Sequence, residues 1–129
     1  MPSNEEILGF SNRWYAPGLE HKEWIEFEEG IRIPRFPLPY YLASKWEAAF
    51  SRGGDLRYSK DFEDIITITN HTEPSDWKSE TDVSNYLKAS YLKLLQDKYA
   101  RELIVGHLSG IDRQNVDMII DKIQIFLNN

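Results

Sequence analysis

The chain has 129 residues, a formal net charge of −6 and no cysteine, a composition typical of one soluble globular domain. The missing cysteines exclude disulfide bonds and thiolate metal sites, and the acidic balance argues against a protein that binds the phosphate backbone of nucleic acid. Because the sequence has neither an apolar run long enough to cross a membrane nor a secretory signal at its start, we expect a cytoplasmic protein.

Residues 1–22 have no regular pattern, and at most a turn of helix is expected around Ser11–Tyr15. Several residues of this stretch are nevertheless too apolar for a free tail: Ile7, Leu8, Phe10, Trp14 and Tyr15. We expect them to pack against the rest of the protein. Packed but irregular structure at this point also suggests that a preceding segment is missing.

A β-hairpin is predicted next, with strands Glu23–Phe27 and Ile31–Arg35. A two-residue turn at Glu29–Gly30 would place polar residues opposite apolar ones. A three-residue loop, Glu28–Gly30, separates the two faces and puts Gly30 at the left-handed position that such loops require. We prefer this second register, which pairs Phe27 with Ile31, Ile25 with Ile33, Glu23 with Arg35 and Glu26 with Arg32.

Glu26 and Glu28 lie two residues apart on the first strand, as metal-binding carboxylates sometimes do. The alternation of polar and apolar residues also explains them as a solvated outer face that runs into the turn. We favour the solvated face.

A helix is predicted over Tyr40–Arg52, with Pro39 in a position suited to the first helical turn. Its apolar stripe is expected to face a core and consists of Leu42, Trp46, Ala49 and Phe50. Lys45 and Arg52, seven residues apart, point the same way from the border of that stripe. Gly53–Gly54 is expected to end the helix.

A second helix starts at Ser59 or Asp61, with Ser59 as the expected N-cap. Its opening turns contain Lys60, Asp61, Glu63 and Asp64. The helix dipole favours carboxylates there, so an acidic first turn needs no catalytic explanation.

Three further helices are predicted: Thr81–Lys98, Tyr99–Leu108 and a last helix capped by Asp112. Together the elements predict an α+β fold in a single domain spanning residues 1–129. Residues 1–36 contain the irregular segment and the β-hairpin, and residues 37–129 form a bundle of about five helices.

Most catalytic motifs are absent from the sequence. There is no glycine-rich phosphate loop or nucleophile elbow. The histidines His21, His71 and His107 share no metal-ligand spacing, and we expect them to lie at the surface or to cap helices. The four tryptophans are expected to pack.

One group of charged residues remains, on the two helices that follow the hairpin: Lys45, Arg52, Lys60, Asp61 and Asp64. A cation near carboxylates at a helix start is a common arrangement for handling a triphosphate. The cation neutralises phosphate charge, while the carboxylates orient it or bind a metal. A structural ion pair between the two helices would have the same spacing, so both interpretations stay open.

Three segments share a wider pattern: Ile7–Tyr15, Pro39–Ala48 and Ser59–Ile65. With the hairpin between the first two, they resemble bacterial nucleotidyltransferase-like proteins related to the abortive-infection (AbiEii-type) toxins of type IV toxin–antitoxin systems. The resemblance covers nearly the whole chain but only the C-terminal portion of the family pattern. It implies an incomplete nucleotidyltransferase fold.

The resemblance also implies roles for the charged residues. Lys45 matches the lysine of the family's Lys-x-x-Ala-like motif. Arg57, Lys60, Asp61 and Asp64 approximate the family's Arg-x-Lys-Asp-x-x-Asp motif. The spacing from the arginine to the lysine is one residue too long. We therefore assign nucleotide binding to Lys45 and Lys60, with Arg52 on the stripe of Lys45. The catalytic positions are assigned to Asp61 and Asp64, which orient the nucleotide or the acceptor.

The family's metal-binding motif, Gly-Ser followed by Asp-x-Asp, is absent from this sequence. In the family it lies on strands that precede the portion matched here, and Met1–Pro2 resembles an interior Met-Pro that follows the last metal-binding carboxylate. Nucleotidyl transfer depends on metal ions that neutralise phosphate charge. We assign no metal ligand and expect this chain alone to be inactive. Its expected cofactors, a nucleoside triphosphate and magnesium, would bind firmly only in a complete site.

A non-catalytic interaction module is the alternative. A two-stranded sheet is marginal unless it packs on helices or gains strands. Its edge favours pairing with a separately encoded N-terminal nucleotidyltransferase half or, as a homodimer, with a second copy. Neither nucleic acid nor a membrane is an expected partner of this chain alone.

Overall fold

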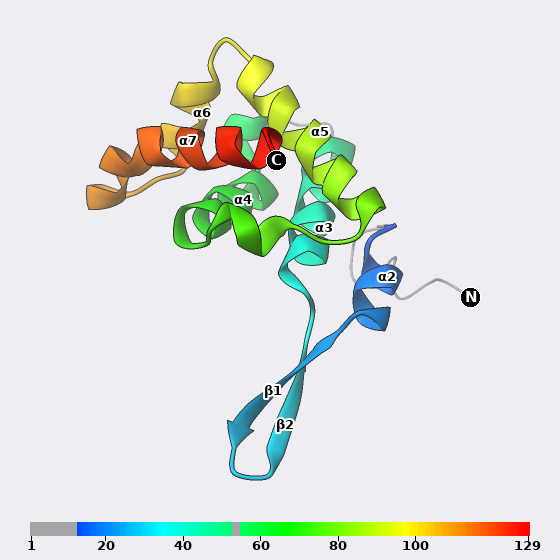
Figure 1. Ribbon diagram of the computed structural model, residues 1–129. Coiled ribbons are helices and arrows are strands. Elements are labelled where there is room, and N and C mark those ends of the chain that lie inside the picture. Colours follow the sequence, from blue (N-terminus) through cyan, green and yellow to red (C-terminus); the bar gives the residue numbers. More distant parts are fainter. Residues whose placement is uncertain (1–12, 53–54) are drawn as a thin grey trace.

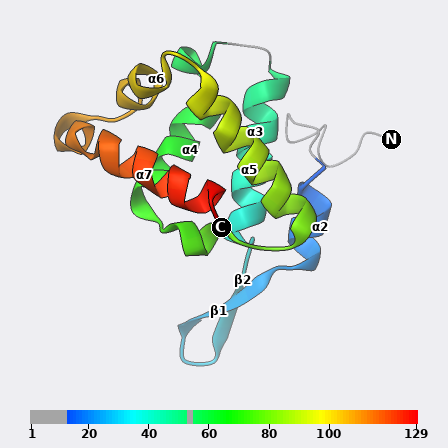
Figure 2. The ribbon, with the colours of Figure 1, turned by 45° about the horizontal axis from the view of Figure 1, so that its top comes forward.

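The computed structural model describes residues 13–52 and 55–129. A β-hairpin projects from a body of helices, and the second view shows it clear of that body as well (Figures 1 and 2). The expected helix-rich bundle is confirmed. In the part of the chain that is described, no helix is both long and apolar enough to cross a bilayer. Three expectations fall outside the described residues: the packing of Ile7, Leu8 and Phe10, the place of Met1–Pro2, and the helix end at Gly53–Gly54.

The hairpin consists of β1 (Glu23–Glu28) and β2 (Ile31–Arg35), which pair in antiparallel fashion. Gly30 in the turn has a φ of +80°, the left-handed conformation expected for it. Three of the predicted pairs are confirmed: Glu23 with Arg35, Ile25 with Ile33 and Glu26 with Arg32.

The predicted pairing of Phe27 with Ile31 is wrong. Ile31 pairs with Glu28 instead, and an irregularity between Glu26 and Glu28 takes up the extra residue. A β-bulge of this kind lets the two-residue turn at Glu29–Gly30, which we disfavoured from the sequence, coexist with the preferred register further along the strands. Neither of the two regular registers considered from the sequence contains it.

Six α-helices lie within the described residues: α2 (Tyr15–Glu20), α3 (Leu38–Ser51), α4 (Lys60–His71), α5 (Thr81–Gln96), α6 (Ala100–Gly106) and α7 (Val116–Leu127). Short 3₁₀ turns connect some of them: η1 (Leu56–Tyr58), η2 (Pro74–Trp77) and η3 (Gly110–Asn115). The prediction that Asp112 caps the last helix is wrong. Asp112 lies inside η3, and Asn115 occupies the N-cap of α7 because the chain makes a 3₁₀ turn first.

Ser59 is the N-cap of α4, as predicted. Its Oγ accepts a hydrogen bond of 3.1 Å from the backbone N–H of Phe62. This bond satisfies one of the backbone donors that every helix start leaves without an intrahelical partner. It also fixes the direction in which the first turn of α4 presents its carboxylates.

The other end of α4 is capped by a side chain from α7. The Nζ atom of Lys122 donates hydrogen bonds to the carbonyl oxygens of Thr69 (3.3 Å), Asn70 (3.0 Å) and Thr72 (2.8 Å). Lys122 is itself buried. An ammonium group at a helix C-terminus meets both the dipole and the carbonyls that lack intrahelical partners.

Aromatic rings fill the centre of the helical body. Trp46 of α3 and Trp77 of η2 are fully buried, and both contact Tyr91 of α5 with ring centroids 5.3 Å apart. The predicted core stripe of α3 is thereby confirmed at Trp46. Of the four tryptophans expected to pack, Trp24 lies outside the buried core: it is 51% exposed on β1, and Lys22 Nζ lies 5.7 Å from the centroid of its ring.

Candidate functional site

The charged residues singled out in the sequence meet between α3 and α4. Lys45 Nζ lies 2.9 Å from Asp64 Oδ2 and 3.5 Å from Asp61 Oδ1. Arg52, one residue beyond the end of α3, places Nη1 3.2 Å from Asp61 Oδ2. The seven-residue spacing on one helix and the three-residue spacing on the other thus bring two cations and two carboxylates together.

Lys60 is the outer member of the group. Its Nζ lies 3.8 Å from Asp64 Oδ1 and 3.5 Å from Glu63 Oε2. The Lys60 side chain is mostly exposed, whereas Asp61 is buried at 6% exposure. The group therefore runs from a buried carboxylate to a cation that faces the solvent.

Lys45 keeps its charge in this position. Partial burial lowers the pKa of Lys45, but the hydrogen bond to Asp64 and the charges of Asp64 and Asp61 outweigh it, so the pKa lies above its usual value. An ammonium group with a raised pKa is charged throughout the physiological range. The site therefore has a fixed cation beside a buried carboxylate.

A pocket of about 760 Å³ opens over these residues. Five cations line it, together with the Asp61 carboxylate: Lys22, Arg35, Lys45, Arg52 and Lys60. Its apolar side comes mainly from Tyr15, Leu19, Phe36 and Tyr41. A concave site with an apolar wall and a few convergent charges is the usual form of a small-molecule binding site.

Sequence reasoning missed two of the five cations of this pocket and its apolar wall. Lys22 and Arg35 lie just before β1 and at the end of β2, so the hairpin brings them together. The pairing of Glu23 with Arg35 was predicted and contained that signal, because it places both ends of the hairpin beside each other. The walls supplied by Tyr15 and Phe36 have no comparable signal in the sequence.

The wall formed by α2 is anchored on α3 and α5. Trp14 is buried, with its ring centroid 5.1 Å from that of Tyr86, which confirms the expected packing of this residue. The Tyr86 hydroxyl donates a hydrogen bond of 2.6 Å to Glu47 Oε2, and Arg13 lies 3.6 Å from Glu47 Oε1. Burial and the Glu47 carboxylate raise the pKa of Tyr86, so its hydroxyl stays protonated.

Gly18 allows α2 to approach the pocket closely. A Cβ atom at this position would lie 2.1 Å from two ring carbons of Phe36, which lines the pocket. We expect Gly18→Ala to displace α2 or Phe36 and to lower the free energy of unfolding by about 1–3 kcal/mol. Thermal and denaturant unfolding measure this effect.

The matched control is Gly106→Ala, at the end of α6, where an added Cβ meets no atom within 4 Å. This change should leave stability unchanged or raise it slightly, because alanine favours a helix over glycine. Equal effects of the two substitutions would contradict the close approach of α2 to Phe36.

The carboxylates of the site do not fit a magnesium ion. Each of the four oxygens of Asp61 and Asp64 lies within 3.8 Å of a lysine or arginine nitrogen. Across residues 13–52 and 55–129, no three histidine or acidic side chains are grouped so that they could hold a metal ion. Glu26 is exposed on β1, in agreement with the solvated face that we favoured for it.

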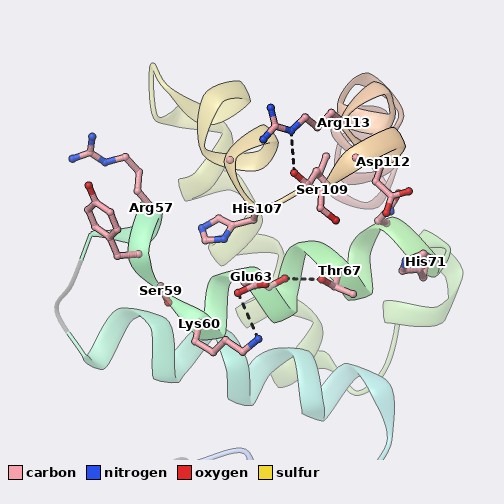
Figure 3. A pocket seen from close by; sticks show the side chains of 15 residues that line it. Arg57, Ser59, Lys60, Glu63, Thr67, His71, His107, Ser109, Asp112 and Arg113 are labelled. Carbon is pink, nitrogen blue, oxygen red and sulfur yellow. Dashed lines mark hydrogen bonds and ion pairs between the residues drawn. The ribbon is translucent and has the colours of Figure 1, made fainter.

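A second pocket, of about 770 Å³, lies beside α4 and contains polar and mixed charged groups (Figure 3). One wall is the side of α4 with Glu63 and Thr67, and the facing wall is the segment 106–113. His107 Nε2 lies 2.8 Å from the carbonyl oxygen of Leu56; a carbonyl only accepts, so Nε2 carries the proton. Lys60 lines both pockets.

The histidines occupy helix ends, as the sequence predicts. His21 and His107 are the C-cap residues of α2 and α6, and His71 is exposed in the last turn of α4. The resemblance gave Arg57 a place in a nucleotide-binding motif, but Arg57 lines the second pocket and pairs with Asp55 at 2.5 Å.

Comparisons of the chain with protein-family models, with curated proteins and with solved structures give no match.

Proposed function

We propose that the pocket over α3 and α4 binds the phosphate groups of a nucleoside triphosphate, as the nucleotide-holding part of a nucleotidyltransferase-like protein. The observation that carries the proposal is the presence of five cations in the lining of one pocket, two of them paired with the buried carboxylate of Asp61, in a chain with a net charge of −6. Arginine and lysine are the side chains that bind phosphate groups.

The contacts suggest different tasks for the cations and the carboxylates. Arg52 and Lys60 are largely exposed and can turn toward a bound phosphate, while Lys45 holds a charge deeper in the pocket. Asp61 and Asp64 keep these cations in place and act as positioning residues. The aromatic rings of Tyr15, Phe36 and Tyr41 offer the apolar surface that a nucleobase needs.

The reaction we propose for the complete protein is transfer of a nucleotidyl group from a triphosphate to RNA or protein, as in the toxins that the sequence resembles. Our proposal for this chain is limited to binding, because its sequence lacks Gly-Ser and Asp-x-Asp. Roughly millimolar affinity is expected when one partner supplies only part of a site.

Titration of the four nucleoside triphosphates and of inorganic triphosphate, each with magnesium and followed by NMR shifts, tests the proposal. We expect shifts at Lys45 and Arg52 that are similar for all five ligands if phosphate dominates. Arg52→Gln should weaken binding by about tenfold, the worth of one charge-assisted hydrogen bond.

Arg101→Gln is the matched control, since Arg101 is an exposed arginine on α6 that pairs with one carboxylate, Asp117, as Arg52 pairs with Asp61. Equal weakening by both variants would show non-specific attraction and contradict the proposed pocket. Micromolar binding with metal-dependent turnover would contradict the claim that this chain alone is inactive.

A second candidate function is favoured by the hairpin. Its two strands project from the helical body, and in the described residues its sheet contains no third strand (Figure 1). We propose that it binds another chain, either a separately encoded N-terminal nucleotidyltransferase half or a second copy. Light scattering separates the two, because a monomer at high concentration contradicts a homodimer.

A further inference from the structure

Arg113, in η3, differs from the other arginines whose side chains the structure describes. Each of the others forms an ion pair with a carboxylate: Arg13, Arg35, Arg52, Arg57 and Arg101. Arg113 has no such partner in residues 13–52 and 55–129, where its Nε atom donates one hydrogen bond of 3.3 Å to the carbonyl oxygen of Leu108. The two Nη groups of its guanidinium are left to bind an acceptor from outside the chain.

Arg113 lines the second pocket, where the other lysine and arginine side chains are already paired. Lys60 lies 3.5 Å from Glu63 Oε2, and Arg57 pairs with Asp55. Asp112 stands on the same wall as Arg113, but Figure 3 shows the two side chains pointing in different directions, and no ion pair joins them in the described part of the chain. The lining therefore contains one arginine whose charge no neighbouring carboxylate holds.

A buried amide group opens onto the same pocket. Asn70, in the last turn of α4, is 7% exposed and lines the pocket. Its Oδ1 accepts a hydrogen bond of 3.1 Å from Asn115 Nδ2, so the planar amide turns its own Nδ2 away from Asn115. This Nδ2 is not closed off from solvent, and it donates to no group of the described residues. Buried polar groups usually have a hydrogen-bond partner, so an acceptor in the pocket would complete Asn70.

A carboxylate is the acceptor that fits these donors best. The two oxygens of one carboxylate match the fork of one guanidinium, and the single charge matches the single unpaired arginine. A phosphate dianion would need a second unpaired cation, which the described lining lacks.

The rest of the lining favours a ligand with hydroxyl groups over one with an apolar tail. Thr67 and Ser109 contribute hydroxyls from opposite walls of the pocket (Figure 3). His107 contributes an acceptor, because Nδ1 of a neutral imidazole accepts when Nε2 carries the proton. These groups lose their water when a ligand enters, and only polar groups on the ligand replace it.

We infer that the second pocket binds a hydroxylated monocarboxylate of the sugar-acid type. The carboxylate binds to Arg113 and Asn70, and the hydroxyl groups bind to the polar side chains around it. A volume of about 770 Å³ is sufficient for a ligand of this size. The inference does not depend on the function proposed for the pocket over α3 and α4.

Gluconate is the probe, because it combines one carboxylate with several hydroxyl groups. It is titrated into the full chain and followed by NMR of the backbone amides and of the Asn70 side-chain amide. We expect saturable shifts at Asn70 Nδ2 and around Arg113, with a dissociation constant of roughly millimolar order. Sorbitol, which has the hydroxyl groups without the charge, should give no saturable shift. Hexanoate, which has the charge without the hydroxyl groups, should bind several-fold more weakly.

Arg113→Gln should weaken gluconate binding by roughly tenfold, through the loss of a charge-assisted hydrogen bond. Arg57→Gln is the matched control, since it removes an arginine that lines the same pocket but is held by Asp55. We expect it to change the affinity by less than about twofold. Unchanged signals of the buried Trp46 and Trp77 report that each variant keeps its core.

Equal weakening by Arg113→Gln and Arg57→Gln, or equal shifts with gluconate and sorbitol, would overturn the role of the unpaired arginine and with it the inference. Hexanoate that binds as tightly as gluconate would overturn the class of ligand. Shifts at Lys45 and Arg52 in place of Asn70 and Arg113 would put the anion in the other pocket and would also overturn the inference. A protein that shows no shift with gluconate would contradict the inference and leave the triphosphate proposal unaffected.

Discussion

Lys122→Met should lower the free energy of unfolding by about 2–3 kcal/mol, the cost of leaving buried carbonyls without a donor. Methionine keeps the apolar length of the lysine stem, so the change removes the ammonium group with little loss of packing. The carbonyls of Thr69, Asn70 and Thr72 would then face an apolar side chain at the end of α4. Denaturant unfolding with a two-state fit measures the loss.

Lys78→Met is the control for this substitution. Lys78 is exposed between η2 and α5, and surface changes of this kind usually shift stability by no more than about 0.5 kcal/mol. If both variants unfold at the same denaturant concentration, Lys122 does not cap α4 as described. Hydrogen exchange at the last turn of α4 should quicken only in Lys122→Met.

Asp61→Asn should lower the free energy of unfolding by about 2 kcal/mol. This is less than the loss of about 3–5 kcal/mol that is typical when one partner of a buried ion pair is removed. The expected loss is smaller because neither cation is left buried without a partner. Lys45 keeps its contact with Asp64, and the Arg52 side chain is 56% exposed to water. The asparagine preserves shape and one acceptor, so the change isolates the negative charge. Thermal and denaturant unfolding at neutral pH measure it.

Asp117→Asn provides the comparison, since Asp117 is exposed and pairs with the exposed Arg101. We expect Asp117→Asn to lower the free energy of unfolding by less than about 1 kcal/mol. Double-mutant cycles test the contact directly. The effects of Asp61→Asn and Arg52→Gln on the free energy of unfolding should not be additive, because the two residues interact. The effects of Asp61→Asn and Arg101→Gln should be additive. Additivity in both cycles would mean that Arg52 and Asp61 do not interact in solution.

Local rules predict the two helices of the site well. The apolar stripe of α3 and the serine cap of α4 are short-range patterns, and they predict where Lys45 and Asp61 lie on their own helices. The same rules fail at the bulge after Glu26, because the twist of a tight turn decides between registers that differ by one residue.

Long-range partners account for the rest of what was missed. Lys122 lies among Ile119, Ile123 and Phe126 on the buried side of α7, and a lysine in such a pattern is a sign of a buried partner. The partner itself, the end of α4, is some fifty residues away in sequence and has no local signature. Arg35 reaches the pocket for a similar reason, through the pairing of the two strands.

Lys60 links the occupancy of the two pockets, since it lines both. A single ammonium group cannot neutralise anions on both sides of α4 at once. An anion that draws Lys60 into one pocket therefore lowers the affinity of the other pocket for an anion. Thermodynamic linkage makes the effect reciprocal, so the two pockets would show negative cooperativity toward anions without any movement of the backbone.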